Sequence, residues 1–244
     1  FIEHERASAQ REAPPHGEVG MSVVHRFFEG VKERGFVLRK RTYLPGSSVG
    51  RHVITRDQFV LVLEGEGEYV THGQVHKLRP GTAVYAYDDT PIAIRPTGGA
   101  ALSLLMAWSR AEQPVPDAYV VVDRDVAHLE PAPVGEQGRS VNYKLFMGEP
   151  GRMLEFRRRT LEVGAAIGQH VVSNDQAYYV LQGAGEMRVN GRVHKLEAGM
   201  AAYVYDSSAL SIKQTGPEPL SYILTFPYAG KPPTLPAVVV DGAR

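Results

Sequence analysis

The sequence predicts an all-β protein built from two tandem β-barrels that are related by approximate two-fold symmetry. The main observation is a short stretch that occurs twice, once from His52 to Gln58 and once from His170 to Gln176, each time followed by an apolar run and a Gly-x-Gly. The second observation is that strand-like runs of about five to eight residues alternate with turn residues, while a 3.6-residue period is almost absent. Two copies of one β domain are the simplest interpretation.

The repeat covers most of the chain without an insertion or a deletion. Residues 118 positions apart match at glycines, at a His-Lys-Leu run and at a Tyr-x-Tyr-Asp run, as in Gly46 and Gly164, His76 to Leu78 and His194 to Leu196, and Tyr85 to Asp88 and Tyr203 to Asp206. The 244 residues have the length of two domains of ordinary size. We therefore predict an N-terminal arm over residues 1–15, a first barrel over residues 16–126 and a second barrel over residues 127–244.

The elements expected in the first copy begin with the arm, which is rich in charge and ends in Pro14-Pro15. We expect it to be a mobile arm or a strand lent to a partner subunit. Apolar and β-branched runs bounded by turn residues then predict strands over residues 58–63, 68–71, 74–78 and 83–87.

Two further features complete the expected elements. The pairs His72-Gly73 and, more strongly, Asn190-Gly191 predict two-residue hairpin turns, because both central residues of the favoured turn need positive φ. Residues 124–129 are the best candidate for a short helical turn. Residues 119–122 and 238–240 occupy the same place at the end of each copy, so we expect them to be integral to the barrels or exchanged between them.

Composition excludes several classes of function. The chain has 27 basic and 27 acidic side chains and an isoelectric point near 7.3, which gives no electrostatic basis for binding nucleic acid or an anionic membrane. It has no cysteine, which removes disulfides, thiolate nucleophiles and zinc-thiolate sites. No apolar run approaches the roughly 18 residues of a membrane span, and residues 2–15 lack the apolar core of a signal peptide. A cytoplasmic protein is expected.

The residues around the repeated stretch resemble the motifs of the cupin family. The first cupin motif has Gly, His-x-His, Glu and Gly at fixed spacing, and the two copies have at those positions Gly46, His52, Ile54, Gln58 and Gly65, and Gly164, His170, Val172, Gln176 and Gly183. The second motif has Gly, Pro-x-Gly, His and Asn, and the copies have Gly81, Tyr87, Asp89, Ile92 and Pro96, and Gly199, Tyr205, Ser207, Leu210 and Gln214. The resemblance implies a bicupin, in which each half is a jelly-roll-like β-barrel.

The departures from the motifs concern the metal site. The resemblance implies a divalent metal held by three histidines and one glutamate, but each copy retains only one imidazole and one amide, His52 with Gln58 and His170 with Gln176. A neutral imidazole and a neutral amide leave most of a coordination sphere to water. We therefore expect no metal ligands of the usual cupin kind and no tightly bound cofactor, and leave open a weakly bound divalent metal.

The remaining histidines are the candidate catalytic residues. His52 and His170 share a strand face with aliphatic residues, and an unperturbed pKa near 6.5 suits proton transfer at neutral pH. Alternatively, each is a buried histidine bonded to the neighbouring glutamine. Tyr178 should point inward, where Val60 stands in the first copy, and either orients a substrate and donates a proton or forms part of the wall.

Several polar side chains are candidate substrate-binding residues. Gln58 and Gln176 would position the substrate, and Tyr203 and Tyr205 would form an aromatic rim unless they pack in an interface. The alternating pairs Arg39 and Arg41, and Arg157 and Arg159, would hold a carboxylate or phosphate through paired donors unless they lie on a solvated sheet face.

Three functions are consistent with these residues. The first is an enzyme of the isomerase or lyase class that acts on a small metabolite, with a barrel histidine as general acid or base. The second is a non-catalytic small-molecule-binding or structural bicupin. The third is a metal-dependent amidohydrolase-like bicupin similar to ureidoglycine aminohydrolase, which needs more metal ligands than these positions offer. A small-molecule ligand and a homodimer formed through edge strands are the expected partners.

Overall fold

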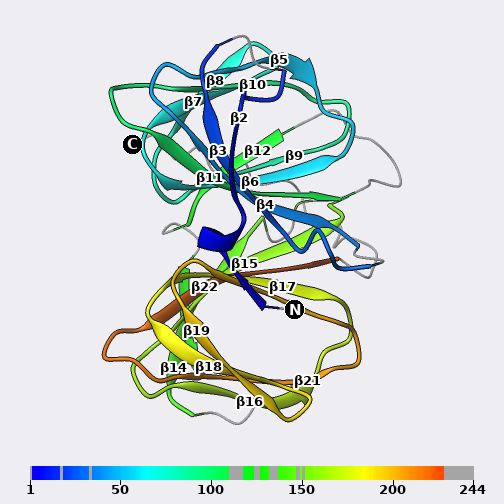
Figure 1. Ribbon diagram of the computed structural model, residues 1–244, viewed down its shortest axis with the longest axis vertical. Coiled ribbons are helices and arrows are strands. Elements are labelled where there is room, and N and C mark those ends of the chain that lie inside the picture. Colours follow the sequence, from blue (N-terminus) through cyan, green and yellow to red (C-terminus); the bar gives the residue numbers. More distant parts are fainter. Residues whose placement is uncertain are drawn as a thin grey trace.

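The protein consists of two stacked β-sandwiches, one from each half of the sequence (Figure 1). The computed structural model describes residues 2–16, 19–32, 35–109, 118–123, 127–131, 137–146, 149 and 152–227, with side chains at all of these except 118–122 and 127–131. The helix described over its full length is the 3₁₀ turn η1 (Glu5–Ala7), and no described helix has the length and apolarity needed to cross a membrane. The all-β prediction is confirmed.

The first sandwich contains a large and a small antiparallel sheet. The large sheet has the strand order β12-β9-β6-β11-β4-β3-β2 and the small sheet β5-β10-β7-β8. The strands are β2 (Ala9–Glu12), β3 (Ser22–Phe27), β4 (Val37–Tyr43), β5 (Val49–Val53), β6 (Asp57–Glu64), β7 (Gly67–Thr71), β8 (Gln74–Leu78), β9 (Thr82–Ala86), β10 (Pro91–Pro96), β11 (Leu102–Ser109) and β12 (Ala118–Val122).

The second sandwich repeats this arrangement. Its large sheet has the order β1-β20-β17-β22-β15-β14-β13 and its small sheet β16-β21-β18-β19. The strands are β1 (Ile2–His4), β13 (Ala127–Pro131), β14 (Arg139–Leu145), β15 (Leu154–Leu161), β16 (Ala166–Val171), β17 (Gln176–Gln182), β18 (Ala184–Val189), β19 (Arg192–Glu197), β20 (Met200–Val204), β21 (Ala209–Gln214) and β22 (Leu220–Pro227). Neither half is a closed barrel, since no ladder joins its two sheets among the described residues; below, "barrel" means one such sandwich.

Period-two alternation builds three apolar cores from these strands. On β6, Val60 and Val62 point into the first barrel, while Phe59 and Leu61 point to the opposite face of the sheet. That opposite face packs against the large sheet of the second barrel, where the rings of Phe59 and Phe156 stack with centroids 3.4 Å apart. The large sheets thus meet back to back, and each barrel keeps an interior of its own.

The N-terminal segment differs from the prediction of a mobile arm or a partner's strand. Strand β1 pairs with β20 of the second barrel, with Ile2 opposite Ala202, and β2 pairs with β3 of the first barrel. Strand β12 pairs with β9 of its own barrel, with Val120 opposite Val84. Because Ile2 and Val120 lie 118 residues apart, as do Val84 and Ala202, β1 and β12 are equivalent edge strands. The other predicted edge strand, residues 238–240, lies outside the described residues.

The turns follow the sequence closely, with one exception. Both predicted hairpin turns have positive φ at their two central residues, 46° and 78° at His72 and Gly73 and 48° and 83° at Asn190 and Gly191. The predicted helical turn at residues 124–129 is wrong where the structure describes it, because Ala127 begins strand β13, which pairs with β14. Residues 124–126 lie outside the described residues.

Glu5 connects the two barrels. Its N–H donates to the carbonyl of Gly199 at 2.9 Å, and its carboxylate accepts from Nζ of Lys40 at 2.9 Å and from the hydroxyl of Tyr179. Burial alone would raise the pKa of Glu5, but the hydrogen bonds from Tyr179 and Lys40 and the charge of Lys40 outweigh it, so the pKa lies below 4.5. The ionised carboxylate therefore stabilises the folded chain.

We predict that Glu5→Ala lowers the free energy of unfolding by about 1–3 kcal/mol, because the buried hydroxyl of Tyr179 loses its acceptor. A lowered folded-state pKa gives stability that is present above the unfolded pKa and is lost as the pH falls through the folded value. Urea denaturation should therefore show a difference between wild type and variant that is full above pH 4.5 and shrinks below it. A difference that does not change with pH would contradict the ionic contribution, and Glu5→Gln, which keeps an acceptor, should lose only that contribution.

Candidate functional site

The first barrel contains a cavity of about 470 Å³. Its apolar wall comes from β4, β5, β10 and β11, through residues such as Tyr43, Val49, Ile92 and Met106. Its polar wall comes from β2 to β6 and the segment after β2, and comprises Glu12, His16, Arg26, Arg39, Arg41, His52, Thr55, Arg56 and Gln58. A cavity of this size, with an apolar wall and convergent polar groups, suits a small-molecule ligand.

Three arginines converge on this cavity from adjacent strands. Arg39 and Arg41 point the same way because they are two residues apart on β4, and Arg26 stands opposite Arg39 on β3. The carboxylate of Glu12 accepts from both Arg26 and Arg41, and Arg41 also donates to Oγ of Ser22 at 2.8 Å. Arg26 also lies 3.9 Å from the exposed carboxylate of Glu29. Arg26 and Arg41 therefore have carboxylate partners, and the third guanidinium is left over.

The third guanidinium, that of Arg39, has no ion pair or hydrogen bond among the described residues. Its Nε is buried without a partner, and the group lies over the ring of Trp108, 5.4 Å from the ring centroid. Burial, together with repulsion from Arg26 and Arg41, lowers the pKa of Arg39. An uncompensated cation beside a cavity is a site of attraction for an anion.

In the second barrel, the arginine at the equivalent position has a carboxylate partner within the protein. Arg157, the equivalent of Arg39, lies over Phe226 at 5.5 Å and pairs with the buried carboxylate of Glu155 at 3.2 Å. In the first barrel, Val37 stands where Glu155 stands in the second. The absence of this one carboxylate leaves Arg39 available to a ligand.

The predicted alternative of a solvated sheet face does not hold for the other two arginines. Arg41 and Arg159 are 4% and 5% exposed, and each donates to a buried serine hydroxyl, Ser22 at 2.8 Å and Ser140 at 3.0 Å. Arg41 lines the cavity of the first barrel, whereas Arg159 belongs to the second barrel, described below. The alternation in the sequence indicated the shared face but not its burial.

His52 lies at the cavity wall near the end of β5. Its Nδ1 is 2.9 Å from the carbonyl of Gly50, and its ring stacks on that of His16 with centroids 4.0 Å apart. Burial lowers the pKa of His52, the bond to Gly50 opposes this, and His16 lowers it further, so the net pKa is below 6.5. A neutral imidazole whose Nδ1–H donates to a carbonyl keeps a free lone pair on Nε2, which suits it to act as a base. No sequence signal placed His16 here.

In the second barrel, two tyrosines occupy interior positions that carry smaller side chains in the first barrel. Tyr178 and Tyr222 stand where Val60 and Leu104 stand in the first barrel, their rings are 5.7 Å apart, and both are fully buried. The hydroxyl of Tyr178 donates to Oε1 of Gln176, and burial raises the pKa of Tyr178 far above its usual range. His170 keeps the bond to a carbonyl that His52 has, from Nδ1 to Gly168 at 3.0 Å. Tyr178 therefore points inward as predicted, where it packs as part of the wall.

The tyrosines predicted as an aromatic rim lie elsewhere. Tyr203 packs between the barrels against Phe28 and Phe36, and its hydroxyl donates to Asp175 at 2.6 Å. Tyr205 is 40% exposed and contacts the ring of Tyr203. Neither lines either of the two hollows described here. Interface packing, the alternative weighed for them, accounts for the position of Tyr203, whereas Tyr205 lies partly exposed beside it.

The metal-binding positions of the cupin motif do not fit a metal in this barrel. Of the four positions, His52 alone is an ordinary metal ligand, since Ile54 and Ile92 are buried aliphatics and Gln58 is a neutral amide. Ile92 stands directly opposite His52 in the ladder between β10 and β5, where the motif would place the third histidine. Within the part of the chain that the structure describes, no three His, Cys, Asp or Glu side chains are grouped to hold a metal ion.

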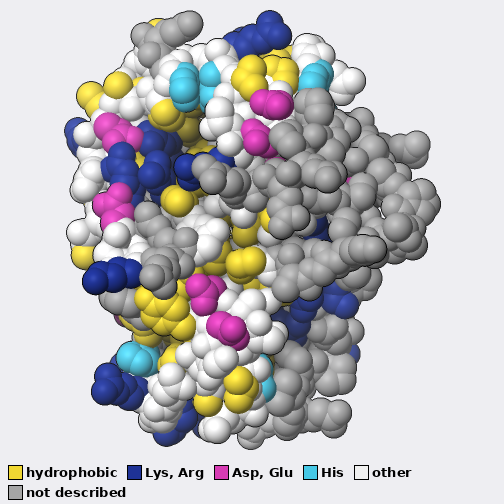
Figure 2. Space-filling model, turned by 90° about the vertical axis from the view of Figure 1, so that its right-hand side faces the viewer, with side chains coloured by type: hydrophobic (Ala, Val, Ile, Leu, Met, Phe, Trp, Pro, Cys, Tyr) yellow, Lys and Arg dark blue, Asp and Glu magenta, His cyan; other side chains and the backbone are white. Residues whose placement is uncertain are grey.

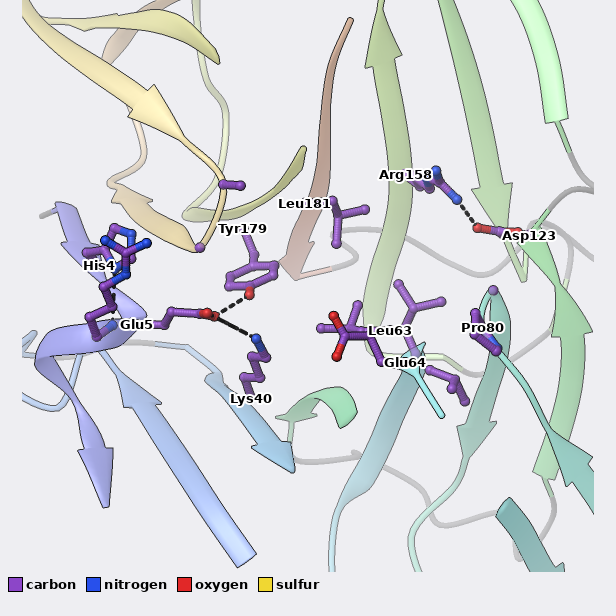
Figure 3. Close-up of a pocket in the computed structure, with 16 residues that line it drawn as sticks. His4, Glu5, Lys40, Leu63, Glu64, Pro80, Asp123, Arg158, Tyr179 and Leu181 are labelled. Carbon is purple, nitrogen blue, oxygen red and sulfur yellow. Dashed lines mark hydrogen bonds and ion pairs between the residues drawn. The ribbon is translucent and has the colours of Figure 1, made fainter. Parts of the chain in front are cut away.

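A second hollow, of about 560 Å³, lies between the two barrels (Figure 3). Two ion pairs line it, Glu5 with Lys40 and Asp123 with Arg158, and the charged side chains of Arg6 and Glu64 also belong to its lining. The two pairs are related by the repeat, because Glu5 and Asp123, like Lys40 and Arg158, are 118 residues apart. The groups of these two pairs already satisfy each other, so the cavity of the first barrel is the better candidate for a ligand.

The surface gives no sign of a large charged partner on the side shown in Figure 2. There, basic side chains of the upper, first barrel lie next to acidic ones, and no extended area of one sign is visible among the described residues. This agrees with the balanced composition of the chain.

Comparison with known proteins supports the two-barrel architecture. The model of the cupin domain matches residues 40–108 and again residues 157–226. A comparison with curated proteins found no match.

Solved structures show the same plan over nearly the whole chain. The putative glyoxylate-induced protein from Pseudomonas aeruginosa superposes with a TM-score of 0.80 at 16% identity, covering 93% of this chain and 88% of that one. Protein Ylba from E. coli gives 0.72 at 13% identity, with 93% and 90% covered. Oxalate decarboxylase from Bacillus subtilis, a protein described with Mn(II) centres, gives 0.70 at 12% identity, with 92% and 76% covered. With a cupin domain matched in each half and bicupin proteins among its structural neighbours, this chain belongs to the cupin family.

Proposed function

We propose that the first barrel binds a small organic acid and that the protein acts on it as an acid–base enzyme of the isomerase or lyase class. The observation that carries this proposal is the uncompensated guanidinium of Arg39 at the wall of a cavity of about 470 Å³. The proposed site comprises Arg39 and Arg41 as the cationic wall, His52 as the base and Gln58 as a polar contact.

A carboxylate fits the environment of Arg39 better than other anchoring groups. The planar guanidinium donates two parallel hydrogen bonds to a carboxylate, and such charge-assisted pairs are about twice as strong as neutral ones. A bound carboxylate would also relieve the repulsion that Arg39 experiences from Arg26 and Arg41. A neutral or cationic ligand would do neither.

The same arrangement supports proton transfer next to the carboxylate. When a base removes a proton from the carbon beside a carboxylate, negative charge develops on the carboxylate oxygens. A guanidinium bound to these oxygens stabilises that charge, and electrostatic stabilisation of this kind often contributes more to catalysis than any other single effect. The neutral imidazole of His52, with Nε2 free, supplies the base on the same cavity wall.

Two of the structural neighbours have names that refer to small carboxylates, glyoxylate in one and oxalate in the other. At 12–16% identity they share the fold alone with this chain, so the names support the proposal only as an agreement in ligand type.

A non-catalytic binding protein is the second candidate. The imidazoles that line the cavity, those of His52 and His16, are stacked on each other and therefore lie on one side of it. Epimerisation commonly uses a base on each face of the substrate, so this arrangement favours the non-catalytic alternative. The metal-dependent hydrolase alternative is not proposed, because the donor set at the motif positions does not fit a metal.

Thermal unfolding in the presence of matched small molecules tests the proposal. Butanoate, malate and benzoate, each compared with its uncharged amide at equal ionic strength, should raise the melting temperature where the amide does not, because a ligand that binds the native state stabilises it. Equal shifts for acids and amides, or no shift with any acid at millimolar concentration, would contradict an anion site.

A further inference from the structure

The side-chain amides of the two equivalent glutamines, Gln58 and Gln176, differ in their hydrogen bonds. In the second barrel, Oε1 of Gln176 accepts from the hydroxyl of Tyr178, and its Nε2 donates to Asn174 at 3.4 Å. In the first barrel, Val60 and Arg56 stand at the positions of Tyr178 and Asn174, and the side chain of Gln58 has no hydrogen bond among the described residues. The same amide is thus internally bonded in the second barrel and left without a protein partner in the first one.

The unbonded atom is an acceptor in a buried place. Gln58 is 4% exposed, it lines the cavity, and its Oε1 is buried without a donor. An unpaired buried acceptor is costly, and nearly all such groups in folded proteins have a partner. A ligand that fills the cavity is the natural source of the missing donor, as the Tyr178 hydroxyl is in the other barrel.

We propose that the organic acid recognised by the first barrel carries a neutral hydrogen-bond donor, a hydroxyl group in the first instance, that donates to Oε1 of Gln58; this rests on the proposed function. The donor must be neutral because an ammonium group would be repelled by Arg26, Arg39 and Arg41. An oxo group or a second carboxylate offers acceptors alone and would leave Oε1 unpaired. The substrate class is therefore hydroxy acids, in preference to oxo acids, dicarboxylates and amino acids.

Calorimetric titration of the full chain with a matched series of four-carbon acids tests this inference. The probes are butanoate, 2-hydroxybutanoate, 3-hydroxybutanoate and 2-oxobutanoate, and N-acetylglycine tests whether an amide N–H serves as the donor. Pairing a buried acceptor should make at least one hydroxy acid bind about 5- to 100-fold more tightly than butanoate. The oxo acid should bind no better than butanoate.

Two variants separate this inference from the proposed function. Gln58→Met, which keeps the length of the side chain, should lose the preference, so that the ratio of its affinities for the hydroxy acid and for butanoate falls to about one. The matched control Gln176→Met should keep the wild-type ratio. Equal binding of butanoate and every hydroxy acid by wild type would overturn the inference and leave the anion site intact. No binding of any acid would instead overturn the proposed function. If Gln58→Met fails to fold, the comparison of probes in wild type still decides.

Discussion

Replacing Arg39 with methionine is expected to weaken the binding of a small carboxylate by about 10- to 150-fold, the range for losing a hydrogen-bonded charged partner. The same substitution is expected to leave the free energy of unfolding unchanged or to raise it by about 1 kcal/mol, since it removes a partly buried charge that has no partner in the protein. Methionine keeps the apolar stem that packs beside Trp108. Loss of binding together with unimpaired stability is typical of a residue retained for its ligand.

The matched control is Arg157→Met in the second barrel. Arg157 occupies the equivalent position but pairs with the buried Glu155, so its removal should lower stability and leave carboxylate binding unchanged. Urea denaturation and calorimetric titration with butanoate measure both quantities for the two variants. If Arg39→Met bound butanoate as well as wild type, or if the two variants behaved alike, Arg39 would not be the anchor of the site.

The second large effect is expected at His52. His52→Gln should slow the exchange of the proton at C2 of a bound acid with solvent deuterium by about 100- to 10,000-fold, the usual contribution of a general base. NMR of the acid in D₂O measures this exchange without knowledge of the product. His170→Gln is the control, because His170 lies in the second barrel, where Tyr178 and Tyr222 occupy the interior, and it should exchange at the rate of wild type.

The pH dependence of this exchange follows from the state of His52. Because the pKa of His52 is below 6.5, its base form is already dominant at neutral pH. The exchange rate at low substrate concentration should therefore fall to half of its plateau value at a pH below 6.5, as the imidazole gains a proton. A midpoint above pH 6.5, or wild-type exchange in His52→Gln, would remove His52 as the base. No exchange in wild type would favour the non-catalytic binder.

Much of the fold follows from the repeat in the sequence. The duplicated motifs predict two barrels, and the Asn-Gly and His-Gly pairs predict their hairpin turns because those turns need positive φ. The place of β1 could have been found in the same way. Ile2 to Glu5 lie 118 residues before Val120 to Asp123, so the repeat predicts an edge strand at the N-terminus equivalent to β12. The charged residues of this segment hide its similarity to the apolar β12.

The site was less predictable, because it depends on differences between the copies and on packing in three dimensions. The motif identified His52 and Gln58, and the alternation of residues identified the arginine faces. The interiors of the two barrels differ, however, through two substitutions, Val60 for Tyr178 and Leu104 for Tyr222. The second of these lies outside the motifs. Arg39 lacks a carboxylate partner because Val37 occupies the position that Glu155 has in the second barrel. This difference gains its meaning from the ion pair between Arg157 and Glu155, which only the structure shows.

Some expectations remain predictions, since they concern matters beyond a single folded chain. A cytoplasmic location and a homodimer formed through edge strands are of this kind.

The decisive measurement is the diffraction structure of crystals grown with the acid that raises the melting temperature most. We expect its carboxylate on the guanidinium of Arg39 in the first barrel, within hydrogen-bonding distance, and no ligand between Tyr178 and Tyr222 in the second. A carboxylate bound elsewhere while the first cavity holds only water, or a fully coordinated cation beside His52, would contradict a carboxylate site of this kind.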